Sequence, residues 1–357
     1  MTAEDLEGLG WRSFFAVAWA AEPREGLVPA RVVAAHNRLL RLQTASGEQS
    51  AGISGRLRHQ ARGSFGLPAV GDWVAALMPT EGHRATVHAV LPRRTAFVRR
   101  AAGDVTVVQV LAANVDTVFL VMGLDRDFNL RRLERALVLA WESGAEPVVL
   151  LNKADVCDDV PARVAEAQSS AVGVPVLVLA AKEGQGLDAL APWLSRGRTV
   201  ALLGSSGVGK STIVNRLLGE ERQRTREVRE NDQRGRHTTT HRELVTLPGG
   251  GLLLDTPGLR EIQLWASDES LAAAFEDVES LGAGCRFRDC AHQAEPGCAV
   301  RAAVSAGSLS EARLLSYQKL RAELRSLEVR ADPELQREQR QQWRVIHKAA
   351  KAHRPRE

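Results

Sequence analysis

The sequence predicts a multidomain protein with three parts: a small N-terminal β-barrel, a central α/β domain, and a mostly helical C-terminal domain that carries a metal site. Three observations support this prediction. Short runs rich in Val and Leu recur before residue 105, apolar runs alternate with amphipathic segments further on, and three of the four cysteines lie together near the end. We therefore place the domains at residues 1–105, 106–265 and 266–357.

Composition limits the classes of protein that this chain can belong to. Apolar residues make up 44% of the 357 residues, and no apolar run approaches the ~20 residues that would span a bilayer. The N-terminus lacks the pattern of a secretory signal. We expect a cytoplasmic protein with no membrane partner. The net charge of +4 is compatible with a nucleic-acid partner but does not require one.

The N-terminal part contains five short strand candidates separated by turns that are rich in Gly, Pro and charged residues. They lie at residues 30–34, 39–42, 49–53, 72–77 and 86–91. Five short strands at this spacing favour the oligonucleotide-binding (OB) barrel. Arginines occur nearby at positions 56, 58, 62, 93, 94, 99 and 100, interspersed with Phe65, Trp73 and Phe97. These aromatic side chains either stack on RNA bases or belong to the barrel core.

The central part alternates strands and helices. Residues 115–122 form a buried-strand candidate, and the leucines that follow Asn129 have helical spacing, so that Asn129 is placed to cap a helix. Further short apolar runs occupy residues 147–151, 176–178, 199–203 and 252–254. This order predicts a parallel sheet with helices on both faces.

A glycine-rich phosphate loop follows one of these strands. The apolar run 199–203 leads into this loop, and a helical pattern begins at Ser211. Backbone N–H groups at such a strand-to-helix turn can cradle phosphates, with Lys210 at the β- and γ-phosphates and the Ser211 hydroxyl on Mg²⁺. We expect nucleotide contacts from Gly204, Ser205, Ser206, Gly207, Val208, Gly209, Lys210, Ser211 and Thr212.

A guanine-reading signature lies about fifty residues before the phosphate loop. Its residues, which follow the strand candidate 147–151, are Asn152, Lys153, Ala154 and Asp155. We expect Asn152 to connect this segment to the phosphate loop and the Lys153 stem to lie along the base plane. The Asp155 carboxylate can accept hydrogen bonds that guanine donates and adenine cannot, which favours GTP over ATP. Ala181 and Lys182 follow the next strand candidate, at the position of a second base-contacting loop. Ordinary GTPases carry the base-reading signature after the phosphate loop, so the sequence predicts a circularly permuted P-loop GTPase domain.

Two further segments suit sensing of the γ-phosphate. Asp255 ends a strand candidate and is followed by Gly258, which suits an acid that holds Mg²⁺ through water and a glycine N–H near the γ-phosphate. The charged stretch 220–242 resembles a switch loop, in which we favour Thr239 over Thr238 as the Mg²⁺ ligand. The residue after Gly258 is Leu259, where many GTPases have a water-orienting Gln. We therefore expect slow intrinsic hydrolysis, with the missing group supplied by His237 or by a partner.

The clustered cysteines predict a zinc site. Cys285, Cys290, His292 and Cys298 supply three thiolates and one imidazole at short spacing, which is the composition of a closed structural Zn²⁺ site. A closed shell leaves no position for a catalytic water, so this zinc is expected to be structural. The tail from residue 335 onward is rich in Arg and Lys. It suits a helix docked on RNA, although packing on its own domain is the alternative.

The motif order and the zinc spacing together resemble the bacterial RsgA/YjeQ family of ribosome small-subunit-dependent GTPases. The likeness extends over nearly the whole chain, from Leu9-Gly10-Trp11 and the segment 69–74 through 235–239 to the zinc ligands. The resemblance implies a late assembly factor for the 30S subunit that binds 16S rRNA, with subunit-stimulated GTP hydrolysis coupled to release as GDP forms. In the family Leu259 matches a hydrophobic residue and His237 a switch histidine. A monomer is the default expectation.

The sequence is also compatible with two other functions. The chain could be a nucleotide-gated RNA-binding scaffold with negligible turnover, which Leu259 favours. It could also be an enzyme in which the zinc is catalytic and the phosphate loop serves a kinase-like reaction. The closed zinc shell and Asp155 count against that second alternative.

Overall fold

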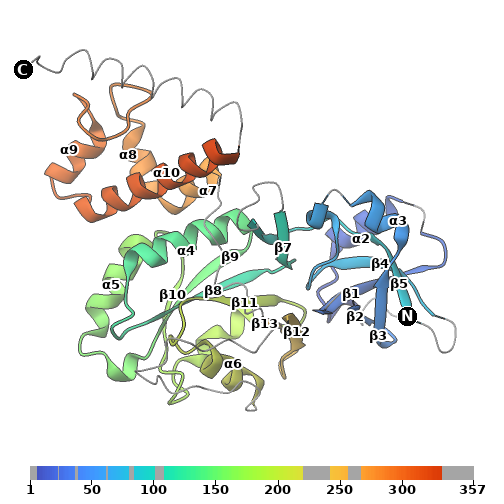
Figure 1. The fold of residues 1–357 in the computed structure, drawn as a ribbon. Coiled ribbons are helices and arrows are strands. Elements are labelled where there is room, and N and C mark those ends of the chain that lie inside the picture. The colour runs from blue at the N-terminus through green and yellow to red at the C-terminus, as the bar shows by residue number, and fades with distance from the viewer. Residues whose placement is uncertain are drawn as a thin grey trace, which may run out of the picture. The chain divides into compact units, whose positions relative to one another are not determined.

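The computed structural model describes residues 6–22, 24–36, 39–61, 63–79, 84–100, 108–219, 242–255 and 267–331. The chain forms two compact units (Figure 1). One unit comprises Met1–Arg99 with Val108–Gln263, and the other comprises Arg100–Val107 with Leu264–Glu357. The domain boundaries predicted near residues 105 and 265 lie outside the described residues. Within the described part of the chain, every helix is too short or too polar to cross a bilayer.

The first unit begins with the predicted five-stranded barrel. Strand β1 pairs with both β2 and β4, and the order β1-β2-β3-β5-β4 therefore closes on itself. Its interior is filled by small and branched apolar side chains such as Val32, Leu42, Val74 and Val87. The elements are α2 (Ser13–Ala20), β1 (Leu27–His36), β2 (Leu39–Thr44), β3 (Gly47–Ile53), α3 (Gly55–Gln60), the 3₁₀ turn η1 (Gly63–Gly66), β4 (Trp73–Leu77) and β5 (Ala85–Val90).

The structure decides between the two expectations for the barrel aromatics. Trp73 and Phe97 are buried in the core, at 0% and 2% exposure, so they do not present free faces for base stacking. Phe65 is about half exposed, and the guanidinium of Arg93 lies 5.2 Å from its ring centroid. Arg93 itself is a structural residue because it binds both carboxylate oxygens of Asp72, at 2.8 and 2.7 Å.

A parallel sheet follows the barrel in the same unit. Its order is β10-β9-β8-β11-β13-β12, in which only β12 runs antiparallel to its neighbours. Helices α4 and α5 cover one face and α6 covers the other (Figure 1). The elements are β8 (Thr117–Gly123), α4 (Leu130–Ser143), β9 (Glu146–Asn152), η2 (Ala154–Val156), α5 (Val160–Ser170), β10 (Val176–Val178), η3 (Leu187–Trp193), β11 (Thr199–Leu203), α6 (Lys210–Leu218), β12 (Arg242–Thr246) and β13 (Leu252–Asp255). The predicted α/β domain is therefore present.

Local sequence explains where α4 begins and ends. The Asn129 side chain accepts a hydrogen bond from the N–H of Arg132, as the predicted cap should. Gly144 ends the helix in the left-handed region, with φ of 78°, where a side chain would be strained. Between these ends Leu133 and Leu137 are buried against the sheet. A two-stranded ladder of β6 (Ala96–Arg100) and β7 (Val108–Ala113) precedes this region.

A buried arginine joins the barrel to the sheet. Arg31 on β1 donates to the carbonyl oxygens of Leu9, Gly71 and Asn114 and to the hydroxyl of Thr199, the first residue of β11. Complete burial lowers the pKa of Arg31 to about 10, which still leaves the side chain charged at neutral pH. The buried guanidinium of Arg31 thus connects the barrel to the N-terminal segment and to the sheet through hydrogen bonds.

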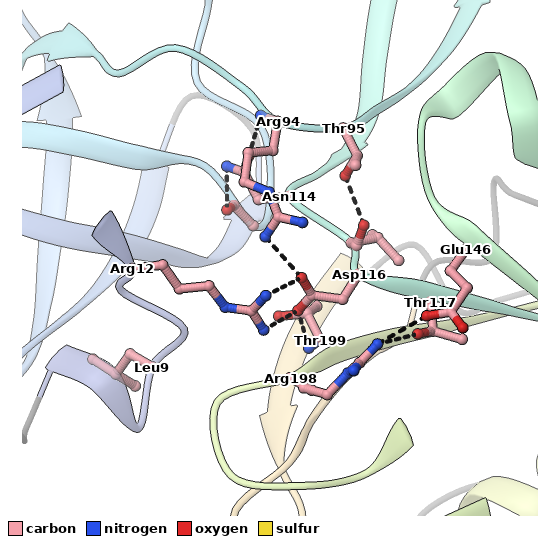
Figure 2. A network of polar contacts seen from close by, with 12 residues as sticks. Leu9, Arg12, Arg94, Thr95, Asn114, Asp116, Thr117, Glu146, Arg198 and Thr199 are labelled. Atoms are coloured by element: carbon pink, nitrogen blue, oxygen red, sulfur yellow. Dashed lines mark hydrogen bonds and ion pairs between the residues drawn. The ribbon is translucent and has the colours of Figure 1, made fainter. Parts of the chain in front are cut away.

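Asp116 forms the second half of this junction. Its carboxylate accepts from Arg12 at 3.1 Å, from Arg94 at 3.0 Å and from the backbone N–H of Thr199 at 2.8 Å (Figure 2). Gly71 lies so close to the end of β7 that a Cβ on Gly71 would be 2.0 Å from the oxygen of Ala113. These contacts fix the barrel at the start of the strand that leads into the phosphate loop.

The second unit is helical, as predicted. Its described elements are α7 (Asp268–Ala274), α8 (Glu276–Gly282), α9 (Ala299–Ser305) and α10 (Glu311–Ala331). Phe275 and Tyr317 form its aromatic core, with ring centroids 5.4 Å apart. The guanidinium of Arg313 stacks on Phe275 at 4.1 Å and binds the Asp277 carboxylate.

Candidate functional site

The phosphate loop lies between a fully buried strand and a helix. All five residues of β11 are buried, and α6 begins at Lys210. Three glycines allow the sharp turn: Gly204, Gly207 and Gly209 have positive φ angles of 156°, 85° and 98°. A Cβ on Gly204 would lie 2.2 Å from the oxygen of Val121, so this backbone approach requires glycine. The loop therefore has the strand-to-helix geometry that exposes N–H groups to phosphates.

Lys210 is held inside the loop that it follows. Its ammonium donates to the oxygen of Gly204 at 2.7 Å and also to the oxygen of Ser205. The side chain is 7% exposed. The positive charge is thus placed at the mouth of the loop, beside the amino end of α6. Anions are favoured at this position by both the helix dipole and the ammonium.

Asn152 joins three loops. Its amide nitrogen donates to the oxygen of Val208 in the phosphate loop at 2.8 Å, and its amide oxygen accepts from the N–H of Ala181 at 3.0 Å. A Cβ on Gly209 would lie 2.2 Å from this same amide nitrogen. The contact between the base-reading segment and the phosphate loop that the sequence predicts is present. Asn152 is 3% exposed, so both bonds are buried.

The rest of the base-reading segment lies at the carboxyl end of β9. Lys153 adopts a positive φ of 67° and donates to Asp125 at 2.5 Å, whereas Asp155 is exposed in the turn η2. Partial burial raises the pKa of Asp125, but the hydrogen bond and charge of Lys153, together with backbone hydrogen bonds from Asp127 and from Asp125 itself, outweigh it, and the pKa of Asp125 is lowered. The Lys153 stem is thereby held in place. An exposed carboxylate at Asp155 is free to accept from a base.

Sequence reasoning missed Asp125 and a polar cluster beside the phosphate loop. Ser205 donates to Asp127 at 2.6 Å and accepts from Arg132 at 2.7 Å, and Arg132 also pairs with Asp127. Asp125 and Asp127 follow β8 directly, and acids at the carboxyl end of a parallel strand are the signal that could have indicated them. Asp127 and Arg132, which lie outside the phosphate loop, thus hold the Ser205 side chain of the loop in place.

The second base loop is tied to the helix that follows the phosphate loop. Arg216 of α6 donates to the oxygens of Ala181 and Lys182. The N–H of Ala154 donates to the oxygen of Leu179 at 3.1 Å, which links the two base-side segments. Ala180 forms an isolated bridge with Gln185 that closes this short loop. The base-side loops and the phosphate loop therefore form one connected edge.

Asp255 is the last residue of β13. This strand pairs in parallel with β11, with Leu254 opposite Ala201, so Asp255 lies at the same carboxyl edge as the phosphate loop. Oxygen donors at Asp255 and Ser211 suit the ligand preference of Mg²⁺. The other predicted γ-phosphate residues, which are His237, Thr238, Thr239, Gly258 and Leu259, lie outside the described residues.

The four predicted zinc ligands converge in the second unit. All four ligand atoms lie within 4.8 Å of one another. The Sγ atoms of Cys285 and Cys298 are 3.8 Å apart, and they lie 3.6 and 3.4 Å from Nδ1 of His292. Tetrahedral Zn–S bonds of about 2.3 Å place two sulfurs about 3.8 Å apart, so the donor set and its spacing fit Zn²⁺. Burial lowers the pKa of His292, which favours the neutral imidazole that binds metals.

Glu295, which sequence reasoning also missed, holds the zinc loop. Its carboxylate accepts from the backbone N–H groups of Ala291, Gln293 and Ala294, at 2.9, 2.7 and 3.0 Å. Hydrogen bonds from its own N–H and from these three residues lower the pKa of Glu295 to about 2. His292, between these donors, has a positive φ of 58°. A carboxylate that accepts several N–H bonds can thus stabilise a backbone turn around the ligand.

Comparisons with known proteins agree with this geometry. The family model described as RsgA GTPase matches residues 90–265. The chain is 52% identical to the small ribosomal subunit biogenesis GTPase RsgA of Opitutus terrae and 46% identical to that of Syntrophotalea carbinolica, in each case over 97% of both chains. Among solved structures, YjeQ from Thermotoga maritima aligns with a TM-score of 0.64 at 27% identity, covering 84% of this chain and 98% of that one.

A second solved structure supports the fold. YloQ, a circularly permuted GTPase, aligns with a TM-score of 0.62 and covers 85% of this chain and 96% of its own. Its sequence identity is 22%, so the likeness concerns the fold. The permuted order of the motifs, the matching family model and full-length identity of 52% lead to one conclusion. The chain belongs to the RsgA family of circularly permuted GTPases.

Proposed function

We propose that this protein binds GTP at the carboxyl edge of its sheet, hydrolyses it to GDP, and acts in late maturation of the small ribosomal subunit. The observation that carries the proposal is the pair of buried bonds made by Asn152 to Val208 and Ala181. This side chain connects a base-reading segment to a phosphate loop that follows it in the chain. The names of the full-length relatives supply the ribosomal part of the proposal.

Base and phosphates are read by separate segments. Asp155 accepts from guanine, the Lys153 stem lies along the base plane, and Ala154, Ala181 and Lys182 complete the base pocket. The N–H groups of residues 204–212 surround the phosphates, with Lys210 at the β- and γ-phosphates. The residues proposed for nucleotide binding are Asn152, Lys153, Ala154, Asp155, Ala181, Lys182, Gly204, Ser205, Ser206, Gly207, Val208, Gly209, Lys210, Ser211, Thr212, Asp255 and Gly258.

Hydrolysis requires charge stabilisation and an oriented water. Ser211, Thr239 and, through water, Asp255 would hold Mg²⁺, which neutralises charge on the phosphate oxygens when it is bound. Lys210 stabilises the charge that develops on the transferred phosphoryl group. Leu259 cannot orient a water, so His237 or a group on the ribosome supplies this step. Turnover by the protein alone is therefore slow, and the 30S subunit accelerates it.

The flanking domains supply the ribosome contacts. The barrel and the basic tail bind 16S rRNA through their arginines and lysines, and hydrolysis is coupled to release from the subunit. One structural Zn²⁺ on Cys285, Cys290, His292 and Cys298 holds the C-terminal domain together. A single copy of the chain binds each subunit.

The test is phosphate release from GTP and from ATP, with and without purified 30S subunits, at low and at high salt. We expect strong acceleration by 30S subunits for GTP alone, and loss of this acceleration at high salt because rRNA contacts are electrostatic. Equal turnover of ATP would contradict the role of Asp155.

A second candidate function rests on Leu259. A protein without a water-orienting Gln can serve as a nucleotide-gated RNA-binding scaffold with negligible turnover. Tight, GTP-dependent binding to 30S subunits without accelerated phosphate release would favour this alternative.

A further inference from the structure

The barrel and the GTPase sheet are joined by main-chain hydrogen bonds at one specific place. Strand β12 lies at the end of the GTPase sheet, and its outer edge is covered by β1 of the barrel. The pairing comprises Ala34 with Glu243 and Ala35 with Arg242. An uncovered edge strand would be a site for strand addition by a partner. In this protein its own barrel occupies that edge.

This contact lies at the end of the β12–β13 hairpin that faces the nucleotide. Arg242 is the first residue of β12 and directly follows the segment 220–241, which contains the predicted Mg²⁺ ligand Thr239. On the other side of β12, Glu243 is in register with Asp255, the last residue of β13. Ala34 of β1, Glu243 of β12 and Asp255 of β13 are therefore neighbours in register across three adjacent strands.

A side-chain pair reinforces the same position. Arg41 on barrel strand β2 pairs with the Glu243 carboxylate, and it also lies 3.4 Å from Glu48 on β3. Arg41 thus has one acidic partner in the barrel and one in the GTPase sheet. The pair borders an open groove of about 320 Å³ that is also lined by Gln43, Glu48 and Thr246. Because the Arg41 and Glu243 side chains are 44% and 28% exposed, solvent screens their attraction, and reversal of one charge is the substitution that perturbs this position most.

We propose that Arg41 and Glu243 are positioning residues through which the barrel sets the register of the β12–β13 hairpin and thereby places Asp255 toward Mg²⁺. This inference deepens the proposed GTPase function and rests on it. Arg31 and Asp116 anchor the barrel to the start of β11, while Arg41 and Glu243 connect it to the strand pair that ends at Asp255. The barrel therefore contacts β11 directly and is connected to β13 through its neighbour β12.

The proposal distinguishes positioning from general stability. If Arg41 acts only on stability, its removal lowers the melting temperature and leaves the Mg²⁺ dependence of nucleotide binding unchanged. If it positions Asp255, the Mg²⁺ concentration for half-maximal binding rises because the ligand is misplaced.

The experiment titrates Mg²⁺ against binding of a fluorescent, non-hydrolysable GTP analogue to the full-length protein without ribosomes. We expect Arg41→Glu and Glu243→Arg each to raise the half-saturating Mg²⁺ about tenfold, because each substitution replaces attraction between the barrel and β12 by repulsion. The double variant R41E/E243R should return it to within about threefold of wild type, because opposite charges again face each other. Hydrogen exchange of residues 252–255 gives an independent readout and should rise in the single variants alone.

Two control variants keep the outcome interpretable. Glu48→Gln removes the barrel partner of Arg41, and Arg163→Glu breaks an exposed pair with Glu166 on α5. Both should bind Mg²⁺ and nucleotide as wild type does. Unchanged Mg²⁺ dependence in Arg41→Glu, or an equal rise in Glu48→Gln, would overturn the positioning role. Failure of the wild-type protein to bind the analogue would instead refute the proposed function itself.

Discussion

The phosphate loop and the zinc loop hold a charged group by different means. The phosphate loop is fixed by its surroundings: β11 is fully buried, Asn152 binds Val208, and the Asp127–Arg132 pair binds Ser205. The zinc loop lies between the short helices α8 and α9, and its four ligands and Glu295 hold it. The first site is therefore preformed by the fold, whereas we expect the second to depend on a bound Zn²⁺.

This contrast predicts that zinc removal has the largest effect on folding, confined to the C-terminal unit. Cys298→Ser removes a ligand and also the sulfur that accepts from the N–H of Arg301 at the start of α9. We expect complete loss of bound zinc and unfolding of residues 267–331, because structural zinc contributes about 10 kcal/mol or more to small metal-bound domains. Zinc content and hydrogen exchange of the full-length protein measure this, with GTP binding as the control.

Retention of zinc and of protected amides in Cys298→Ser would show that the helical core around Phe275 and Tyr317 is sufficient for folding. Loss of GTP binding in the same variant would contradict the independence of the two sites.

At the phosphate loop, the largest effect should come from the charge that stabilises the transferred phosphoryl group. Lys210→Ala should reduce 30S-stimulated phosphate release by about 100- to 1,000-fold, as loss of one transition-state donor does in other enzymes. The melting temperature should change little because β11 and α6 keep their packing. Arg163→Ala on α5, which also removes one positive charge, serves as a charge-matched control. Turnover within tenfold of wild type would remove Lys210 from the catalytic residues.

A smaller effect should follow from loosening the connection between loops. Asn152→Ala removes two buried hydrogen bonds and leaves the oxygen of Val208 and the N–H of Ala181 without this partner. We expect weaker GTP binding by about 2 to 3 kcal/mol, measured by calorimetry. Ser205→Ala removes only the bonds of the loop to Asp127 and Arg132 and should weaken GTP binding less. If both variants bind GTP as tightly as the wild-type protein, these contacts are not needed to hold the loop in its binding conformation.

The smallest effect should come from Glu295. Glu295→Ala should release zinc to a chelator several-fold faster, with the fold intact at saturating zinc, because the loop loses the acceptor for three N–H groups. The depressed pKa of Glu295 means that its contribution is complete above about pH 4.5 and is lost as the pH falls toward about 2. The difference in zinc-release rate between Glu295→Ala and the wild-type protein should therefore become smaller below pH 4.5. A constant difference would indicate that side-chain volume, not charge, matters.

The sequence predicted those parts of the molecule that local patterns encode. The strand-loop-helix at residues 199–218, the cap at Asn129, the barrel strands and the Cys/His cluster all follow from periodicity, turn residues and ligand spacing. The link from Asn152 to the phosphate loop could be predicted because parallel strands end at a common edge.

What could not be predicted depends on pairings between segments far apart in the chain. The buried Arg31, the β1–β12 pairing and the Arg41–Glu243 contact join residues up to 209 positions apart, and no local pattern specifies them. The aromatics Trp73 and Phe97 illustrate the same limit, since core and base-stacking roles have the same sequence pattern and only burial separates them. Acids such as Asp125 and Glu295 resemble solvated loop residues until their partners are seen.

Asp155→Asn is the substitution that best tests whether this chain is a guanine-reading GTPase that the small ribosomal subunit stimulates. An amide at this position can donate a hydrogen bond to the 2-oxo group of xanthine, where the carboxylate accepts from the 2-amino group of guanine. Phosphate release should be measured with GTP and with XTP, each with and without 30S subunits. We expect the variant to lose 30S-stimulated hydrolysis of GTP and to gain 30S-stimulated hydrolysis of XTP. Two results would contradict this role: hydrolysis of GTP by the variant at the wild-type rate, or failure of 30S subunits to stimulate GTP hydrolysis by the wild-type protein.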